Sequence, residues 1–277
     1  MFRLCRVGIA AVLAISVVAS AKAADLFDGD SLRGAFVPPS GFVSYSRWDG
    51  IYFGADWGQS RLNADFNDNL HSQLASFLRG TTIEQEAQIS HLPNVQGNGT
   101  GNAWGGFVGY NWLMSPDLVV GIEGAYHMAQ QPIRASGSDV IARSFTTSGG
   151  TTYNVNMNSR GRLDLKDYAT LRGRAGYVWG QFLPYAALGV SVARMSYRTS
   201  TNLVLTQLSA PPVTVTQTLV SEKDNAIAYG ANFALGIDVA LLPNVFLRGE
   251  YEYIAFAPVS GIRSNVSTFR AGLGAKF

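Results

Sequence analysis

The sequence is poor in cysteine and in charged residues. The first deficit excludes a disulfide-rich protein, and the second argues against a protein that binds nucleic acid. Cys5 is the only cysteine among 277 residues, which excludes a disulfide-stapled scaffold. Charged residues make up 14% of the chain, against roughly 25% in average soluble domains. The 21 Lys and Arg residues are scattered, so no nucleic-acid-binding surface is predicted. Beyond residue 23, no segment approaches the roughly 18 apolar residues of a transmembrane helix.

Residues 1–23 have the parts of a secretory signal peptide. Arg3 and Arg6 form a basic start, residues 7–19 form an apolar run, and small residues precede a cleavage site between Ala23 and Ala24. The apolar run is shorter than the roughly 20 residues that span a bilayer, which makes a membrane anchor the less favoured alternative. Cleavage would leave 18 basic and 19 acidic residues and change the formal net charge from +2 to −1.

From Trp48 to Phe277 the sequence alternates between apolar and small or polar residues. Residues 24–47 show no clear period and are predicted to be a flexible N-terminal segment. In residues 227–239, by contrast, apolar side chains or Ala occupy every odd position, which predicts a strand with one apolar face. Seven further segments follow this period of two, near residues 51–60, 104–112, 118–127, 169–177, 185–192, 245–255 and 269–277.

The connections between these eight segments are of two kinds. Tight turns are predicted at residues 115–117, 180–181 and 242–244, and long polar stretches near 62–101, 129–162 and 198–224, with a modest one near 257–264. Alternation continues on both sides of Pro211 and Pro212, which predicts a hairpin that extends past the membrane. Short turns at one end and long loops at the other are typical of outer-membrane barrels. We therefore predict an all-β fold over residues 48–277: an eight-stranded antiparallel transmembrane β-barrel with short periplasmic turns and long extracellular loops.

A soluble antiparallel sandwich would also alternate, and two features favour the membrane barrel instead. The polar faces carry charges among Gly and Ala, as expected for a crowded interior. The apolar faces carry aromatic residues toward their ends, as in the interfacial girdles of membrane barrels. These aromatic residues are Trp57, Trp104, Trp112, Tyr177, Phe269 and Phe277.

Ten charged residues fall on the polar faces and are expected to point into the barrel. They are Asp56, Glu123, Asp238, Glu250, Glu252, Arg172, Arg174, Arg248, Arg270 and Lys276. Eight strands make a barrel just wide enough for its own side chains to fill. Unpaired charges there would be costly, whereas paired charges can form a plug. We expect a closed barrel with little or no open channel.

Four segments resemble the porin-family, opacity-like outer-membrane β-barrels, a group that includes major surface proteins of α-proteobacteria. Residues 48–55 (WDGIYFGA) resemble the opening strand of that group, and residues 270–277 (RAGLGAKF) its closing strand. Residues 106–112 and 171–177 resemble the second and fourth strands. The resemblance implies a location in the outer membrane of a Gram-negative bacterium and recognition of the terminal Phe277 by the barrel-assembly machinery. It implies less about activity, because members serve as structural surface antigens, weak porins, adhesins or haem-binding proteins.

Other candidate chemistry is weaker. Glu250 and Glu252 could form a catalytic carboxylate pair, but structural pairing with Arg is the favoured interpretation. The three histidines are too dispersed for a metal motif; His71 and His91 could be axial ligands to haem, and His127 is expected at a girdle or loop base. The Gly-rich run 97–102 lacks the Lys of a phosphate loop and is predicted to be a mobile surface loop.

The sequence thus predicts a non-enzymatic structural barrel or surface antigen that contributes to envelope integrity, without a metal or resident cofactor. The expected partners are outer-membrane lipids, lipopolysaccharide and the assembly machinery, with host surfaces or haem as further options and no nucleic acid. The alternatives are a weak porin or a haem-binding uptake protein and, less favoured, a lipid A-modifying enzyme, for which no His-x-Ser pattern occurs in a predicted strand.

Overall fold

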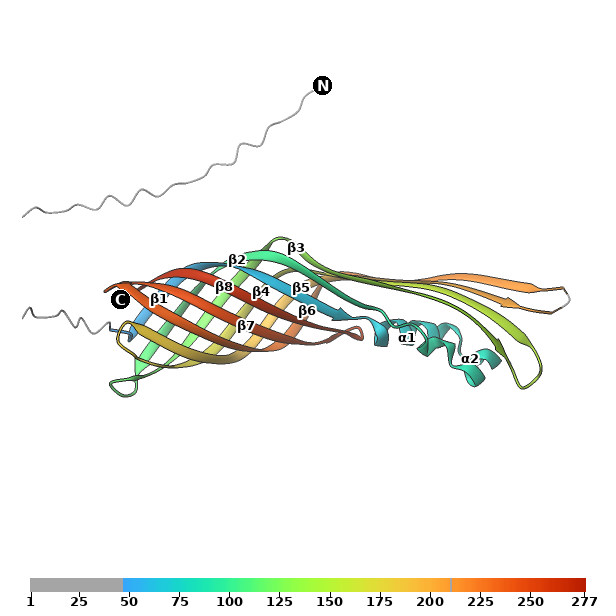
Figure 1. Ribbon diagram of the computed structural model, residues 1–277, viewed down its shortest axis with the longest axis horizontal. Helices are drawn as coiled ribbons and strands as arrows, with labels where there is room; N and C mark the ends of the chain where they lie inside the picture. The colour runs from blue at the N-terminus through green and yellow to red at the C-terminus, as the bar shows by residue number, and fades with distance from the viewer. Residues whose placement is uncertain (1–46, 210) are drawn as a thin grey trace, which may run out of the picture. The chain divides into compact units, whose positions relative to one another are not determined.

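The computed structural model describes residues 47–209 and 211–277, and these residues form a closed antiparallel barrel of eight strands (Figure 1). Each strand pairs with the next, and β8 pairs with β1. The strands are β1 (Gly50–Asp65), β2 (Gln96–Leu113), β3 (Leu118–Thr146), β4 (Thr152–Tyr177), β5 (Phe182–Gln207), β6 (Val213–Leu242), β7 (Val245–Val259) and β8 (Ile262–Lys276). The predicted fold class is confirmed. The predicted signal peptide, its cleavage site at Ala23 and Ala24, and all but the last residue of the segment 24–47 lie outside the described residues.

The barrel wall follows the predicted alternation. Along β6, Ile227, Leu235 and Ile237 are exposed on the outside, whereas Asn232 and Asp238 are buried inside. In β2, Trp104 and Trp112 are exposed on the outer face, as predicted, and Phe107 is buried inside. Each strand therefore presents an apolar outer face, as a lipid-facing wall requires.

Exposed aromatic side chains mark the two ends of this apolar band. Trp57 lies directly opposite Trp104 on the neighbouring strand, at the end where the long connections emerge. At the other end Tyr110 packs against Trp112, with ring centroids 4.9 Å apart, and Phe53 stacks on Phe277 at 5.7 Å. All six predicted girdle aromatics are exposed on the outer wall.

The three tight turns lie where they were predicted, but the long connections are more ordered than expected. The stretch 129–162 is mostly strand, because β3 and β4 continue as a hairpin that pairs out to Thr146 and Thr152. The hairpin predicted around Pro211 and Pro212 is confirmed by β5 and β6. The connection near 257–264 is a tight turn at Ser260 and Gly261, both with positive φ.

The first connection contains short helices: α1 (Asn67–Phe77), α2 (Thr82–Ala87) and the 3-10 helix η1 (Ile89–His91). Their apolar side chains, among them Leu74 and Ile83, pack against Val155, Met157 and Leu203 on the inner face of the extended strands. No helix in the described part of the chain is long and apolar enough to cross a membrane. We call residues 66–95, 133–165, 196–209 and 211–225 the head.

Irregular pairing marks the boundary between the barrel wall and the head. The register shifts between Met128 and Ile133 in β3, between Leu165 and Asp167 in β4, and between Met195 and Tyr197 in β5. These bulges lie in three adjacent strand pairs. In the β5–β6 pair, two residues of β6, Asp224 and Asn225, stand opposite the single residue Ser196 of β5, and Asn225 has a φ of 53°. We call this boundary the seam.

Candidate functional site

The interior of the barrel holds a continuous network of buried charges. Arg172 is at its centre: its guanidinium donates to Glu123 at 2.5 Å and to Glu250 at 2.5 Å, and lies 3.4 Å from Glu252. These residues come from β3, β4 and β7, so the contacts cross the lumen as well as the wall. The side chains of all four residues are at most 2% exposed.

Arg248 extends the network toward the end with the tight turns. It donates to Asp238 at 2.8 and 3.1 Å and to Glu123 at 2.7 Å, and its guanidinium carbon lies 4.0 Å from the centre of the Phe107 ring. Arg174 donates to the same Asp238 at 2.8 Å and stacks on Tyr185 at 3.9 Å. Glu123 and Asp238 thus each accept from more than one guanidinium, which compensates their burial.

Arg270 extends the network toward the head. It donates to Glu252, lies 2.8 Å from Nε2 of His127 and donates to the Tyr168 hydroxyl at 3.0 Å. His127 Nε2 also lies 3.2 Å from Asp56, and the His127 ring stacks on Tyr168.

The structure places all ten predicted interior charges inside the barrel, each at most 8% exposed. Nine of them belong to the connected network just described. The ammonium of the tenth, Lys276, lies 3.7 Å from the centre of the Trp48 ring. Phe277 ends the chain on the outer wall, where its amide donates to Ile51 at 2.9 Å.

Besides Tyr168, four interior residues of the network were not predicted as part of the site. Tyr52 donates to Glu123 at 2.8 Å, Tyr185 to Glu250 at 2.6 Å, and Asn232 to Glu252 at 2.6 Å. The fourth is His127, which was expected at a girdle or loop base; that expectation is wrong, because the side chain is buried in the lumen. The signal was available, since His127 shares its strand parity with Glu123 and so shares its side of the wall.

Apolar layers cover the charged network at both ends. Toward the tight turns lie Trp48, Tyr52, Phe107, Leu183 and Phe246. Toward the head lies a larger cluster that contains, among others, Leu62, Phe66, Leu70, Ile133, Leu165, Ile254 and Val266. Phe66 sits over Gly161, where an added Cβ would come within 2.4 Å of the ring. The lumen therefore consists of an apolar, a charged and a second apolar layer.

The histidines proposed as haem ligands, His71 and His91, lie together in the head. Their ring centroids are 5.0 Å apart with an interplanar angle of 58°, and Nε2 of His71 lies 2.8 Å from the Pro93 carbonyl oxygen. Two rings in mutual contact leave no gap for a planar tetrapyrrole between them, so this arrangement does not fit a bis-histidine haem site. Among the described residues, no group of three or more His, Cys, Asp or Glu side chains could hold a metal ion.

Two further sequence interpretations are resolved by the geometry. The Gly-rich run 97–102 is not a mobile loop but part of β2, where a Cβ at Gly97 would lie 2.6 Å from the carbonyl carbon of Ser136. The glycines are needed because β3 passes this close. Glu250 and Glu252 do share one face of β7, and both are held by guanidinium groups, as the structural interpretation expected.

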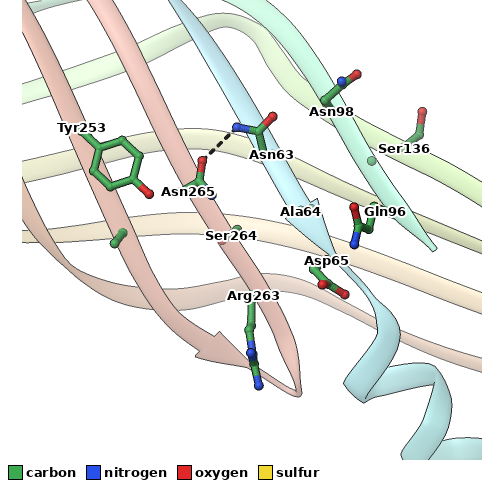
Figure 2. A pocket seen from close by; sticks show the side chains of 12 residues that line it. Asn63, Ala64, Asp65, Gln96, Asn98, Ser136, Tyr253, Arg263, Ser264 and Asn265 are labelled. Atoms are coloured by element: carbon green, nitrogen blue, oxygen red, sulfur yellow. Dashed lines mark hydrogen bonds between the residues drawn. The ribbon is translucent and has the colours of Figure 1, made fainter. Parts of the chain in front are cut away.

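The outer surface beyond the girdle carries an open polar groove of about 570 Å³ on β1, β2, β3, β7 and β8 (Figure 2). Asn63 donates to Asn265 across its floor at 2.8 Å. Asp65, Gln96, Asn98, Tyr253 and Arg263 also line it. These amides and charges can exchange hydrogen bonds with a polar ligand, in contrast with the apolar wall below them.

Several solved structures are similar to the chain at low identity. Ail of Yersinia pestis is 12% identical, over 83% of this chain and 99% of its own, with a TM-score of 0.32. Neisserial surface protein A is 13% identical, over 82% and 97%, with a TM-score of 0.36. OprG of Pseudomonas aeruginosa is 12% identical, over 83% and 96%, with a TM-score of 0.35.

No curated protein matches the sequence. The family model for the outer membrane protein beta-barrel domain, however, matches residues 9–277, almost the whole chain. The match agrees with the closed eight-stranded barrel, its apolar outer band and its aromatic girdles. The chain therefore belongs to the outer membrane protein beta-barrel domain family, and its location is the outer membrane.

Proposed function

We propose that the protein is a structural barrel, closed to solutes, that strengthens the outer membrane and displays its head as a surface antigen. Within the family we assign it to the opacity-like group of α-proteobacteria, on the opening and closing strand motifs at residues 48–55 and 270–277. On this proposal the tight turns face the periplasm and the head faces the outside of the cell.

The layered lumen is the observation that carries the proposal. The four central acids Glu123, Asp238, Glu250 and Glu252 each already accept from Arg, Tyr or Asn donors, so none is left as a bare charge for a passing ion. The apolar layers at either end exclude water, which strengthens each ion pair between them. A pore would need a hydrated path through all three layers.

The proposed partners follow from the outer surface. Membrane lipids contact the apolar band, and lipopolysaccharide contacts the polar surface above the Trp57 and Trp104 girdle. The exposed terminal Phe277 is proposed as the signal for the barrel-assembly machinery. We propose no enzymatic role, because the interior carboxylates are held by guanidinium groups and lie beneath the apolar layers.

Conductance across a planar bilayer tests the closed lumen. The purified wild-type barrel should give no large, steady open state, whereas Arg172→Ala should raise the ion leak by opening the centre of the charged layer. A steady wild-type pore would overturn the proposal and favour the weak-porin alternative. Arg263→Ala, on the outer surface, is the matched control and should leave the conductance at the wild-type level.

Envelope integrity tests the structural role in the cell. A deletion strain should become more sensitive to detergent and polymyxin, and wild-type protein should restore resistance. Unchanged sensitivity would count against a structural role. Absorbance titration of the purified barrel with haem examines the uptake alternative; a saturable Soret shift that is lost in His71→Ala would favour it over the present proposal.

A further inference from the structure

Three arginines gather on the outer face of the head. In one row across the sheet, Arg160 of β4 lies between Ser138 of β3 and Ser200 of β5. In the next row, Arg162 lies between Ser136 and Arg198. The six side chains come from neighbouring rows of three adjacent strands, so the three guanidinium groups share one small area.

This arrangement is unfavourable for the isolated sheet. Arg162 and Arg198 are directly opposite each other on paired strands, and like charges in that position destabilise a sheet. Both members of this pair have an acidic neighbour: Asp164 lies 2.7 Å from Arg162, and Glu222 lies 3.4 Å from Arg198. Within the described part of the chain, no acid lies within ion-pair distance of Arg160. A local rule broken in this way is typical of a functional site.

The arginines and serines line an open groove of about 590 Å³. Its lining consists of three Arg, three Ser and two Gly residues, with no carboxylate among them. Guanidinium groups bind phosphate through paired hydrogen bonds, and hydroxyl groups can donate to phosphate or sugar oxygens. The groove therefore fits a ligand with more than one phosphate group on a polar scaffold.

The position of the groove indicates where the ligand comes from. Ala169 is the last lipid-facing residue of β4 before the seam, and Arg162 lies about 23 Å further along the strand at about 3.3 Å per residue. Arg160, Arg162 and Arg198 all point outward from the sheet, on the side that continues the lipid-facing wall. What lies beside the wall at this level of an outer membrane is the sugar-phosphate head of the surrounding glycolipid.

We propose that Arg160, Arg162 and Arg198 bind the phosphorylated sugars of the outer-leaflet glycolipid. This inference rests on the proposed structural function and deepens it, because it names the phosphorylated sugars as the part of the surrounding lipid that the head binds. The bound phosphates compensate the charge of Arg160 and add to the acids beside the facing Arg pair, so the ligand also stabilises the head sheet.

Calorimetric binding to the full-length barrel in detergent tests the proposal. The probe is the deacylated, phosphorylated oligosaccharide of lipopolysaccharide, and the comparison probe is the same oligosaccharide after dephosphorylation. Wild-type protein should prefer the phosphorylated form. The triple variant Arg160→Gln, Arg162→Gln and Arg198→Gln should bind it about tenfold or more weakly. A matched control, Arg79→Gln with Arg143→Gln, removes two exposed arginines that line neither groove and should bind like the wild type.

Three results would overturn the proposal: equal binding by wild type and triple variant, no preference for the phosphorylated form, or tighter binding of a sulfated heparin hexasaccharide. The last result would assign the groove to a soluble sulfated glycan instead. Folding is checked independently, because Arg198→Gln relieves repulsion and should not lower the unfolding midpoint without ligand. The triple variant should also stay closed in the bilayer, so failure here is distinguishable from failure of the closed-lumen proposal.

Discussion

Replacement of Arg248 by Met gives the sharpest prediction about the charged layer. Arg248 is 1% exposed and makes three hydrogen bonds, two to Asp238 and one to Glu123. The substitution removes the cation but keeps an apolar side chain of similar length beside Phe107. Two buried carboxylates then lose a charged donor without gaining water.

The expected cost is about 3–5 kcal/mol, the range for breaking a buried pair by removing one partner. The lower half of that range is favoured because neither acid is left alone: Arg174 still donates to Asp238, and Arg172 to Glu123. With a denaturant slope of about 2 kcal/mol per molar urea, the unfolding midpoint should fall by about 2 M.

Urea titration of the refolded barrel in lipid vesicles, followed by tryptophan fluorescence, measures this change. Arg194→Met is the control, because Arg194 pairs with Asp167 at the surface with its side chain 57% exposed, and its effect should be much smaller. The double variant Arg248→Met with Asp238→Asn should recover part of the loss, since it removes a carboxylate together with its donor. A single-variant midpoint within about 0.5 M of the wild type would refute the reasoning that the network supports the barrel.

Three other predictions concern the head and the chain end. Phe66→Ala should lower the local unfolding free energy of the helices by about 3–5 kcal/mol. Proteolysis between residues 66 and 95 should then be faster while the barrel stays folded. An unchanged cleavage rate would contradict the packing of Phe66 on Gly161. Hydrogen bonds from Ser148 hold the pKa of Glu86 below its ordinary value. The contact between Glu86 and Ser148 is therefore complete above the ordinary carboxyl pKa and is lost as the pH falls through the lowered pKa of Glu86. Hydrogen exchange of the Ser148 amide in the wild type should accelerate in that pH range. In Glu86→Gln it should follow only the intrinsic pH dependence of amide exchange. Phe277→Ala removes the stack on Phe53 and the proposed assembly signal, and should lower the amount of barrel recovered in outer membranes; undiminished recovery would argue against that signal.

The barrel wall could be predicted from the sequence because the apolar and polar residues alternate with a period of two in eight segments. This alternation determines which side chains face the lumen and which face the lipid. The same parity placed all ten charges inside. It did not predict which acid meets which base, because contacts such as Arg172 with Glu250 depend on the stagger of strands that are not neighbours.

The head was predicted less well, for reasons visible in its residues. Outward Ser, Asn and Arg give residues 133–165 the composition of a loop, although buried Val155, Met157 and Leu163 mark an inner face. Leu70 and Leu74 of α1 and Leu78, which caps it, stand at helical spacing. The many polar residues of the helix nevertheless resemble a solvated loop until the sheet that covers the leucines is known.

The seam has a consequence for how such a protein can vary. Because the bulges at Met128–Ile133, Leu165–Asp167 and Met195–Tyr197 absorb extra residues, strand register above them is uncoupled from register below. An insertion in the head can therefore be accommodated without turning any wall residue from lipid to lumen. The head can therefore change in length and sequence while the charged layer and the lipid-facing band stay the same. A chimaeric barrel that carries the head of another protein would be joined at the seam.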